Sequence, residues 1–288
     1  MKKILLLFLL ITTLSFSKEN VRAVSTSQFT TEILLAIGAE NQILGTAYLD
    51  DEILPELKEK YDKIPVLSKG APTKEQFYAL NPNLLTGWKS IATPKNLGTV
   101  EELKENGVKV VFTKSQDTSK IEDIYDDILM FGDIFNLKDN AKNVVENMKK
   151  DIIKVTENNK NKKSIKVFAY DSQESAPFVV GGSGIGNTMI EIAGGENIFK
   201  DTNFSFGLGT WEKVLDENPE VIIVIDYGNI SYKNKIEYLK NNSPISQLEA
   251  VKNNRFIRVP LSYISAGVKV GKGIEIISSG LREEKKWK

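Results

Sequence analysis

The feature that most constrains this fold is a long amphipathic segment in the middle of the chain, residues 137–159. Its apolar residues mostly recur three or four positions apart, which places them on one face of an α-helix: Ala141, Val144, Val145, Met148, Ile152 and Val155. Asp139 is the expected N-cap, and the Asn- and Lys-rich run 158–163 is the expected end. Such a helix is about 30 Å long, roughly the span of a small domain. We therefore predict that it joins two lobes; the alternative is an ordinary surface helix of a single domain.

Two segments on either side of this helix share one pattern. Residues 73–85 and 210–222 both read Thr-x-Glu, five residues, Asn-Pro and then an apolar run. Each segment has a local explanation, because Thr caps helices, an early Glu suits the helix dipole and Asn-Pro ends helices. That explanation does not account for the same spacing at corresponding places in both halves. We therefore predict two pseudo-equivalent lobes.

Apolar runs alternate with helical patterns on both sides of the long helix. We expect strands at 21–25, 43–47, 83–87, 108–112, 165–170, 221–226 and 256–259, and helices at 30–37, 74–80, 100–105, 188–193, 212–216 and 245–251. Repeated β-helix-β units imply parallel strands with helical crossovers. The predicted fold class is α/β, with two Rossmann-like lobes, parallel central sheets and one long bridging α-helix. The predicted parts are an N-terminal lobe at 18–120, an interlobe helical segment at 121–162 and a C-terminal lobe at 163–288, whose charged tail 282–288 is expected to be solvated.

The first residues, 1–17, have the pattern of a secretory signal peptide. Lys2 and Lys3 precede the unbroken apolar run 4–11, and small residues stand near an expected cleavage site after Ser17. The run is too short to span a membrane, and no other segment approaches the ~20 apolar residues that a span needs. The sequence contains no cysteine that could carry a lipid anchor. We therefore expect a mature protein that is free in the periplasm.

Two absent residue types restrict the chemistry of this chain. Without histidine there can be no Ser-His-Asp or Cys-His catalysis and no imidazole site for zinc or copper. Without cysteine there are no disulfides, so stability must come from the core. Removal of Lys2 and Lys3 leaves 36 basic against 38 acidic residues. The mature chain therefore has no excess of positive charge that would indicate a nucleic-acid partner.

Several short stretches resemble one known family. In the first half they are 25–34, 36–39, 43–45, 64–67, 72–75 and 80–84, and in the second half 194–197 and 250–255. Their order and spacing resemble the substrate-binding proteins of bacterial ABC importers for iron-siderophores, haem and cobalamin, over most of residues 21–260. The resemblance implies two lobes joined by one long helix, a small molecule carried between the lobes, and no enzyme activity.

The resemblance also implies that one glutamate on each lobe docks transiently against arginines of the inner-membrane permease. These positions fall on Glu75 and Glu212, the two glutamates of the repeat. Two carboxylates held apart by rigid lobes can meet two basic sites on a two-fold symmetric partner, and charges at a rim mainly set orientation and association rate. Where the family usually has an Asp after the Pro, this chain has Asn83 and Glu220, and we expect no functional effect.

Aromatic residues gather where the predicted strands end. In open parallel sheets, ligands bind beyond the carboxyl ends of the strands, so two facing lobes would surround one cleft. We predict that a bulky organic ligand binds there, held mainly by aromatic surface. Some of these residues could instead pack the edges of the lobes. The predicted ligand contacts are Gln28, Tyr48, Trp88, Lys89, Tyr170, Phe178, Tyr227 and Tyr263.

The identity of the ligand is less constrained. The chain has only four arginines, and none follows a strand in the expected cleft. A triply anionic catecholate complex is therefore disfavoured unless Lys89 and Lys114 replace arginine forks. Tyrosine can ligate ferric iron or haem directly, whereas cobalamin needs little charge. An iron-siderophore ranks first, with cobalamin and haem as alternatives; no cofactor is implied, and we expect a monomer with a small lobe closure.

Three other interpretations of the sequence stay open. The glycine-rich segment 181–187 invites a phosphate-binding hypothesis but lacks both the Gly-Lys-Ser/Thr and the third glycine of the nucleotide motifs. Asp171 and Asp226, both at strand ends, could form a carboxylate pair for acid–base catalysis. The third interpretation is a carrier that binds a divalent metal ion through carboxylates, but this chain lacks the imidazoles expected for manganese or zinc.

Overall fold

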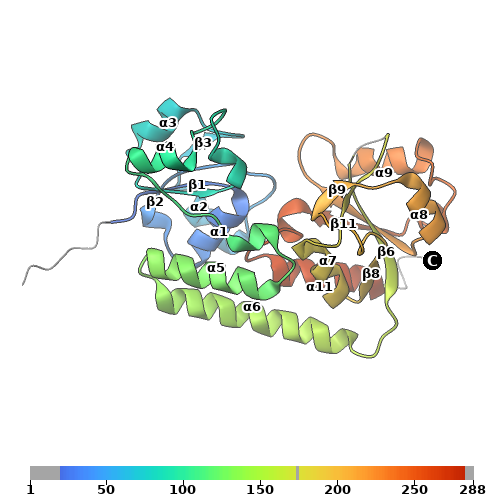
Figure 1. Ribbon diagram of the computed structural model, residues 1–288. Coiled ribbons are helices and arrows are strands. Elements are labelled where there is room, and N and C mark those ends of the chain that lie inside the picture. Colours follow the sequence, from blue (N-terminus) through green and yellow to red (C-terminus); the bar gives the residue numbers. More distant parts are fainter. Residues whose placement is uncertain (1–19, 173–174, 283–288) are drawn as a thin grey trace, which may run out of the picture.

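The computed structural model describes residues 20–172 and 175–282. The predicted signal peptide and the charged tail beyond residue 282 lie outside these ranges. Two separate β-sheets form the two lobes, and one pair of antiparallel helices runs beneath both (Figure 1). This arrangement is the predicted α/β fold with a long bridging helix.

The N-terminal sheet is parallel throughout and has the strand order β3-β2-β1-β4-β5. The sequence predicts four of these strands and three of the four surrounding helices to within a few residues. Strand β3 and helix α2 were not predicted. Helix α2 begins at Pro55, at the helix position where proline is favoured. The elements are β1 (Ala23–Thr26), α1 (Gln28–Ala36), β2 (Ile43–Ala47), α2 (Pro55–Tyr61), β3 (Val66–Ser68), α3 (Lys74–Ala79), β4 (Leu84–Gly87), α4 (Val100–Glu105) and β5 (Lys109–Val110).

The C-terminal sheet has the order β11-β10-β6-β7-β9, with β8 paired to β6, and it is mixed. Its central strands, β10 with β11 and β6, are parallel as predicted, whereas β7 and β9, which were not predicted, are antiparallel to their neighbours. The physical reason is the short connection from β6 to β7, because a parallel crossover needs a dozen or more residues. The strands are β6 (Ile165–Ser172), β7 (Phe178–Val180), β8 (Gly195–Asn197), β9 (Phe206–Leu208), β10 (Val221–Asp226) and β11 (Phe256–Pro260).

The helices of this lobe agree less well with the sequence patterns. The helix predicted at 245–251 is mostly a series of turns, and only its last part becomes helical. Two longer helices, α9 and α11, were not predicted. The helices are α7 (Ile185–Ile192), α8 (Trp211–Glu217), α9 (Tyr232–Asn241), α10 (Glu249–Lys252) and α11 (Val270–Arg282).

The bridging helix α6 (Lys138–Asn159) lies where the sequence predicts it. Its N-cap is Leu137 rather than Asp139, and no side chain caps it; Asp139 stands in the first turn, where a negative charge suits the helix dipole. A second long helix, α5 (Ile121–Ile134), packs antiparallel beside it; the predicted interlobe helical segment 121–162 contains α5 but was not divided into two helices.

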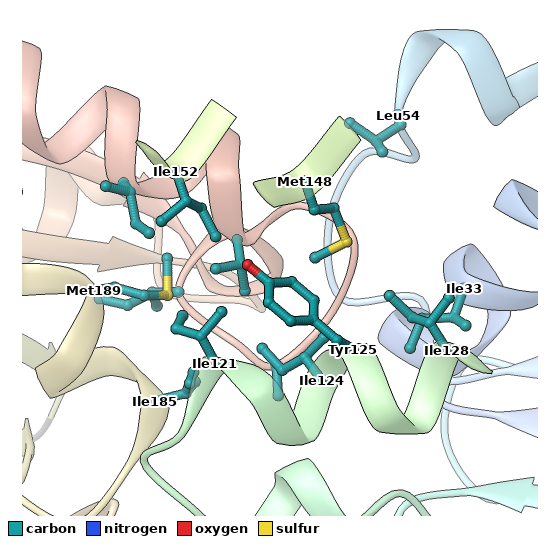
Figure 2. Packing of buried hydrophobic residues seen from close by; sticks show 14 of the residues in the cluster. Ile33, Leu54, Ile121, Ile124, Tyr125, Ile128, Met148, Ile152, Ile185 and Met189 are labelled. Atoms are coloured by element: carbon teal, nitrogen blue, oxygen red, sulfur yellow. The ribbon is translucent and has the colours of Figure 1, made fainter. Parts of the chain in front are cut away.

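A single hydrophobic core extends through both lobes. The buried stripe of α6 packs against α5 and reaches α1 in one lobe and α7 and α11 in the other. Figure 2 shows side chains from these elements meeting around Tyr125, with Ile33 of α1 at one end and Met189 of α7 at the other. The lobes are therefore joined by packed apolar surface as well as by the chain.

The internal repeat corresponds to the same local structure in each lobe. Thr73 and Thr210 are N-caps whose hydroxyls accept a hydrogen bond from the third residue of α3 and α8. Asn81 and Asn218 both have left-handed backbones, with φ of 49° and 44°. Asparagine tolerates this conformation better than most residues, which explains why it recurs before the proline.

The glycines of segment 181–187 are explained by close packing. A Cβ on Gly182 would lie 1.8 Å from the carbonyl oxygen of Lys200, and one on Gly181 would lie 2.2 Å from that of Phe204. Only glycine lets the backbones approach so closely. The segment thus fits a packing role between β7 and α7, and no phosphate is needed to account for it.

The shared core gives a matched test on α6. Replacing Ile152, which is 8% exposed, with Ala should destabilise the protein by about 2–5 kcal/mol, because it leaves a cavity between the lobes. The neighbouring Ile153 is 55% exposed, and Ile153→Ala should change stability by about 0.5 kcal/mol or less. Urea unfolding of both variants measures the difference; equal effects would contradict the assigned helix face.

Candidate ligand-binding site

A cavity of about 760 Å³ lies between the two lobes. One wall is the loop after β2, residues 50–52, and the other is formed by the segments that follow β10 and β11 in the C-terminal lobe. This volume is within the usual range for sites that bind small molecules. The side chains that line it include Asp50, Asp51, Glu52, Asp226, Tyr227, Tyr232, Lys233, Arg258 and Tyr263.

Gln28 fixes the loop that forms the N-terminal wall. Its side-chain oxygen accepts hydrogen bonds from the amides of Asp50 and Asp51, both at 2.9 Å. Its amide nitrogen donates to Asp51 Oδ1 at 3.0 Å and to the carbonyl of Glu52 at 3.3 Å. Tyr48, with φ of 59°, turns the chain from β2 into this loop. Gln28 is buried, so the structure places it behind the wall rather than in contact with a ligand.

A buried lysine ties this loop to the opposite lobe. Lys269 is 1% exposed, and its Nζ lies 3.0 Å from Glu32 Oε1 and 3.3 Å from Asp51 Oδ1. It also donates to the carbonyl of Glu52 at 2.7 Å and to Ser262 Oγ at 2.8 Å. Burial raises the pKa of Glu32, and the charge of Lys269 opposes that rise. These polar contacts join the two lobes, in addition to the apolar contacts between them.

The C-terminal wall contains a second buried pair. The Tyr227 hydroxyl lies near the carboxylate of Asp171, and Lys235 Nζ lies 4.0 Å from Asp171 Oδ1. Lys235 also donates to the carbonyl of Ile225 at 2.6 Å and lies 4.8 Å from the centre of the Tyr227 ring. Burial, followed by the charge of Asp171, raises the pKa of Tyr227 well above its usual value. Tyr227 is therefore a protonated phenol at neutral pH when no ligand is bound.

The two strand-end aspartates have separate partners. Asp171 belongs to the buried pair with Lys235, and burial raises the pKa of its carboxyl. Asp226 forms an ion pair with Arg258 at 2.5 Å and accepts a hydrogen bond from the amide of Tyr232. This arrangement gives no support to a catalytic carboxylate pair.

Trp88 lies in a different and smaller hollow between the lobes, of about 100 Å³. Its ring meets that of Phe29 edge to face, with centroids 4.8 Å apart. Ile185 and Phe206 of the C-terminal lobe line the other side. The predicted aromatic residues are thus divided, with Trp88 here and Tyr227 and Tyr263 in the large cavity.

Four predicted contacts lie elsewhere. Tyr170 is 2% exposed and packs against Trp211 in the core of the C-terminal lobe, so the structure leaves it no surface for a ligand. Tyr48 is half-buried against the apolar cluster on the far face of the N-terminal sheet. Phe178 is half-buried on β7 and is not among the residues that line either hollow. Lys89 is exposed and forms an ion pair with Asp117.

Of the residues that line the large cavity, the predicted ligand contacts include only Tyr227 and Tyr263. Asp50 stands three residues past β2, in an acidic run that could have drawn attention. Tyr232 begins α9, a helix that was not predicted. The loops after β2 and β10 line the cavity; of the residues predicted at these two places, Tyr227 is among the lining residues and Tyr48 is not.

Comparison with known proteins identifies the family. A family model described as "Periplasmic binding protein" matches residues 24–263. The chain belongs to this family of binding proteins. A solved periplasmic binding protein from Veillonella parvula is 31% identical to this binding protein, with a TM-score of 0.84 over 91% of each chain.

Two curated relatives extend the comparison. A vitamin B12-binding protein of Vibrio parahaemolyticus is 23% identical over 81% of this chain and 84% of its own length. An uncharacterized lipoprotein of Methanocaldococcus jannaschii is 28% identical over 74% of this chain, which spans 56% of that relative's length. Of the helices within residues 20–172 and 175–282 of this binding protein, none has the length and apolar character of a membrane span.

The buried lysine between the lobes gives a stability prediction. Lys269→Met should destabilise the protein by about 3–5 kcal/mol, because it leaves Glu32 buried without its counter-ion. The matched control is Lys272→Met, which removes an exposed ion pair to Glu56 between the lobes and should cost about 1 kcal/mol or less. Urea unfolding measures both; a small effect at Lys269 would show that the cluster does not hold the lobes together.

The same variant has a pH signature. The pKa of Glu32 is raised above 4.5 by burial, and loss of Lys269 should raise it further. A group with a raised pKa in the folded state favours folding at low pH and loses that contribution as the pH rises. The stability deficit of Lys269→Met should therefore shrink as the pH falls toward 4.5, and adding Glu32→Gln should reduce it at neutral pH. A deficit that does not vary with pH would exclude Glu32 as its cause.

Proposed function

We propose that this chain is the periplasmic solute-binding component of an ABC importer, which captures a metal chelate between its lobes and delivers it to a permease. The observation that carries the proposal is the cavity of about 760 Å³ between two lobes of the periplasmic binding protein family. Its wall contains Tyr227, Tyr232 and Tyr263, which supply aromatic surface for an organic ligand. The basic and apolar residues within 1–17 support export to the periplasm.

An iron-siderophore chelate is the proposed cargo, with cobalamin or haem as the alternatives. Such chelates combine a bulky organic shell with few exposed charges, which suits a pocket walled by tyrosines. The relative named as a vitamin B12-binding protein supports cobalamin as the second candidate. No resident cofactor is part of the proposal.

Direct titration tests this function. We expect one of a ferric trihydroxamate, cobalamin and haem to bind at micromolar concentration or below, without turnover, in calorimetry on the purified mature chain. Tyr263→Ala should weaken that binding about tenfold or more, because it removes aromatic surface from the cavity wall. Tyr78→Ala, on α3 away from the cavity, is the matched control. Failure of all three ligands to bind would reject the proposal.

Glu75 and Glu212 are proposed to dock with the permease. Each is exposed and is the second residue of its helix, α3 in one lobe and α8 in the other. Figure 1 places α3 at the top of the N-terminal lobe and α8 at the outer side of the C-terminal lobe. Backbone and Thr73 hydrogen bonds lower the pKa of Glu75, so its carboxylate is ionised at neutral pH. The pair thus presents one negative charge on each lobe.

Charge reversal separates docking from ligand capture. The double variant Glu75→Lys and Glu212→Lys should lose uptake in cells and keep the ligand affinity of the wild type, because both residues lie outside the cavity. The control variant carries Glu101→Lys and Glu249→Lys, which are also exposed first-turn acids, one in each lobe. Normal uptake by the first variant, or equal loss in the control, would remove the docking role.

A further inference from the structure

Asp50 is an unpaired acid in the wall of the large cavity. It is half-buried, and its backbone is fixed by the hydrogen bond to Gln28. Among residues 20–172 and 175–282, no side chain forms an ion pair or hydrogen bond with its carboxylate. Tyr227 of the opposite lobe lies close enough for the charge of Asp50 to raise the pKa of that phenol. The carboxylate therefore faces the space between the lobes with its hydrogen-bonding capacity unused.

The basic side chains near the cavity, in contrast, mostly have close acidic partners; the exception is Lys233, which is 84% exposed and lies 4.0 Å from Glu237. Lys235 and Lys269 are buried beneath the tyrosines, and Arg258 is held by Asp226. The two lysines that could have received a catecholate complex are also engaged. The pairs are Lys89 with Asp117, Lys114 with Asp123, Lys233 with Glu237, Lys235 with Asp171, Arg258 with Asp226 and Lys269 with Glu32.

From these two observations we propose that the cavity selects chelates without net negative charge and that Asp50 recognises a cationic group on the cargo, such as a protonated amine. The inference rests on the proposed carrier function and narrows its substrate class. An anionic chelate would meet Asp50 and Glu52, and among the bases that line the cavity only the exposed Lys233 would be available to offset them, because Arg258 is paired with Asp226. An ammonium would complete a charge-assisted hydrogen bond that the protein leaves unmade.

The tyrosine rings do not by themselves account for this preference. Lys235 Nζ lies 4.8 Å from the centre of the Tyr227 ring, and Lys269 Nζ lies at the same distance from that of Tyr263. Arg258 stands 5.7 Å from the ring of Tyr232. Because each ring already has a cation nearby, the carboxylate of Asp50 is the group that distinguishes a cationic ligand from a neutral one.

Three forms of one chelate isolate the effect of charge. Ferrioxamine B is a ferric linear trihydroxamate that ends in a primary amine and is a cation. Acetylation of the amine gives a neutral complex of the same iron centre, and succinylation gives an anion. The wild-type protein should bind the amine about tenfold or more tightly than the acetyl form, and the succinyl form most weakly.

Two variants assign the effect to one residue. Asp50→Asn keeps the size of the side chain, removes the charge, and should bring the affinities for the amine and acetyl forms within about twofold of each other. Glu52→Gln is the matched control on the same loop; its side chain is exposed, and it should keep most of the preference. Calorimetry measures each affinity.

Protonation should reproduce the effect of Asp50→Asn. Burial, followed by the charge of Asp51, raises the pKa of Asp50 to about 6. The preference for the amine form should therefore diminish as the pH falls through 6 in the wild type and stay flat in Asp50→Asn. The other charged or titratable groups that line the cavity are Asp51, Glu52, Asp226, Tyr227, Tyr232, Lys233, Arg258 and Tyr263.

The outcomes separate this inference from the proposed function. Equal binding of the amine and acetyl forms, or a preference that survives Asp50→Asn, would overturn the inference and leave the carrier function intact. If none of the three chelates binds, the inference also fails, and cobalamin and haem then decide whether the carrier function stands. A tenfold preference abolished by Asp50→Asn alone supports it.

Discussion

The structure depends on the apolar layer shared by its two lobes. Helix α6 runs beneath both lobes with α5 packed beside it, and their buried side chains belong to one cluster with those of α1 on one side and of α7 and α11 on the other (Figure 2). Full burial of one aliphatic or aromatic side chain contributes about 1.5–3 kcal/mol. Separating the lobes would expose several such side chains, among them Ile33, Tyr125 and Met189. We therefore expect the cavity to open only by movements that leave this layer packed, such as a small tilt.

The same interface organises the cavity. Lys269 comes from the C-terminal lobe but bonds to the carbonyl of Glu52 and the carboxylate of Asp51, both in the N-terminal wall. Gln28 holds that loop from behind. The wall is thus fixed by both lobes before a ligand arrives, which reduces the entropy that binding must remove. Because Lys269 is fully engaged in this role, it adds no free positive charge to the site.

The sequence predicts the elements whose patterns are long or strongly apolar. The bridging helix and the strands at 43–47 and 221–226 agree with the structure to within a residue. The spacing of Ile121, Ile124, Ile128 and Phe131 indicates α5, which the predicted helical segment 121–162 contains without separating it from α6. The antiparallel strands β7 and β9 have only three residues each, so their pairing depends on tertiary contacts that no local pattern records.

Individual site residues were harder to predict, for a related reason. Tyr170 was expected to follow a strand, but β6 continues to Ser172, and the side chain at 170 therefore points into the core with Trp211. Gln28 does follow β1, yet the loop of the neighbouring strand folds over it. An error of two residues in a strand end exchanges a ligand contact for a core residue, because the loop that reaches the cleft begins two residues later.

The rigid interface also affects how a permease could recognise this protein. If Glu75 and Glu212 dock as proposed, their separation is set by two lobes that share one core, and it changes little when the cavity fills. Rim charges at a nearly constant spacing favour the correct orientation and a fast encounter, but they distinguish poorly between loaded and empty forms. A preference for the loaded form would then have to arise where the ligand itself alters the surface. In this fold that place is the mouth of the cavity, where the loop at residues 50–52 faces the segment after β10.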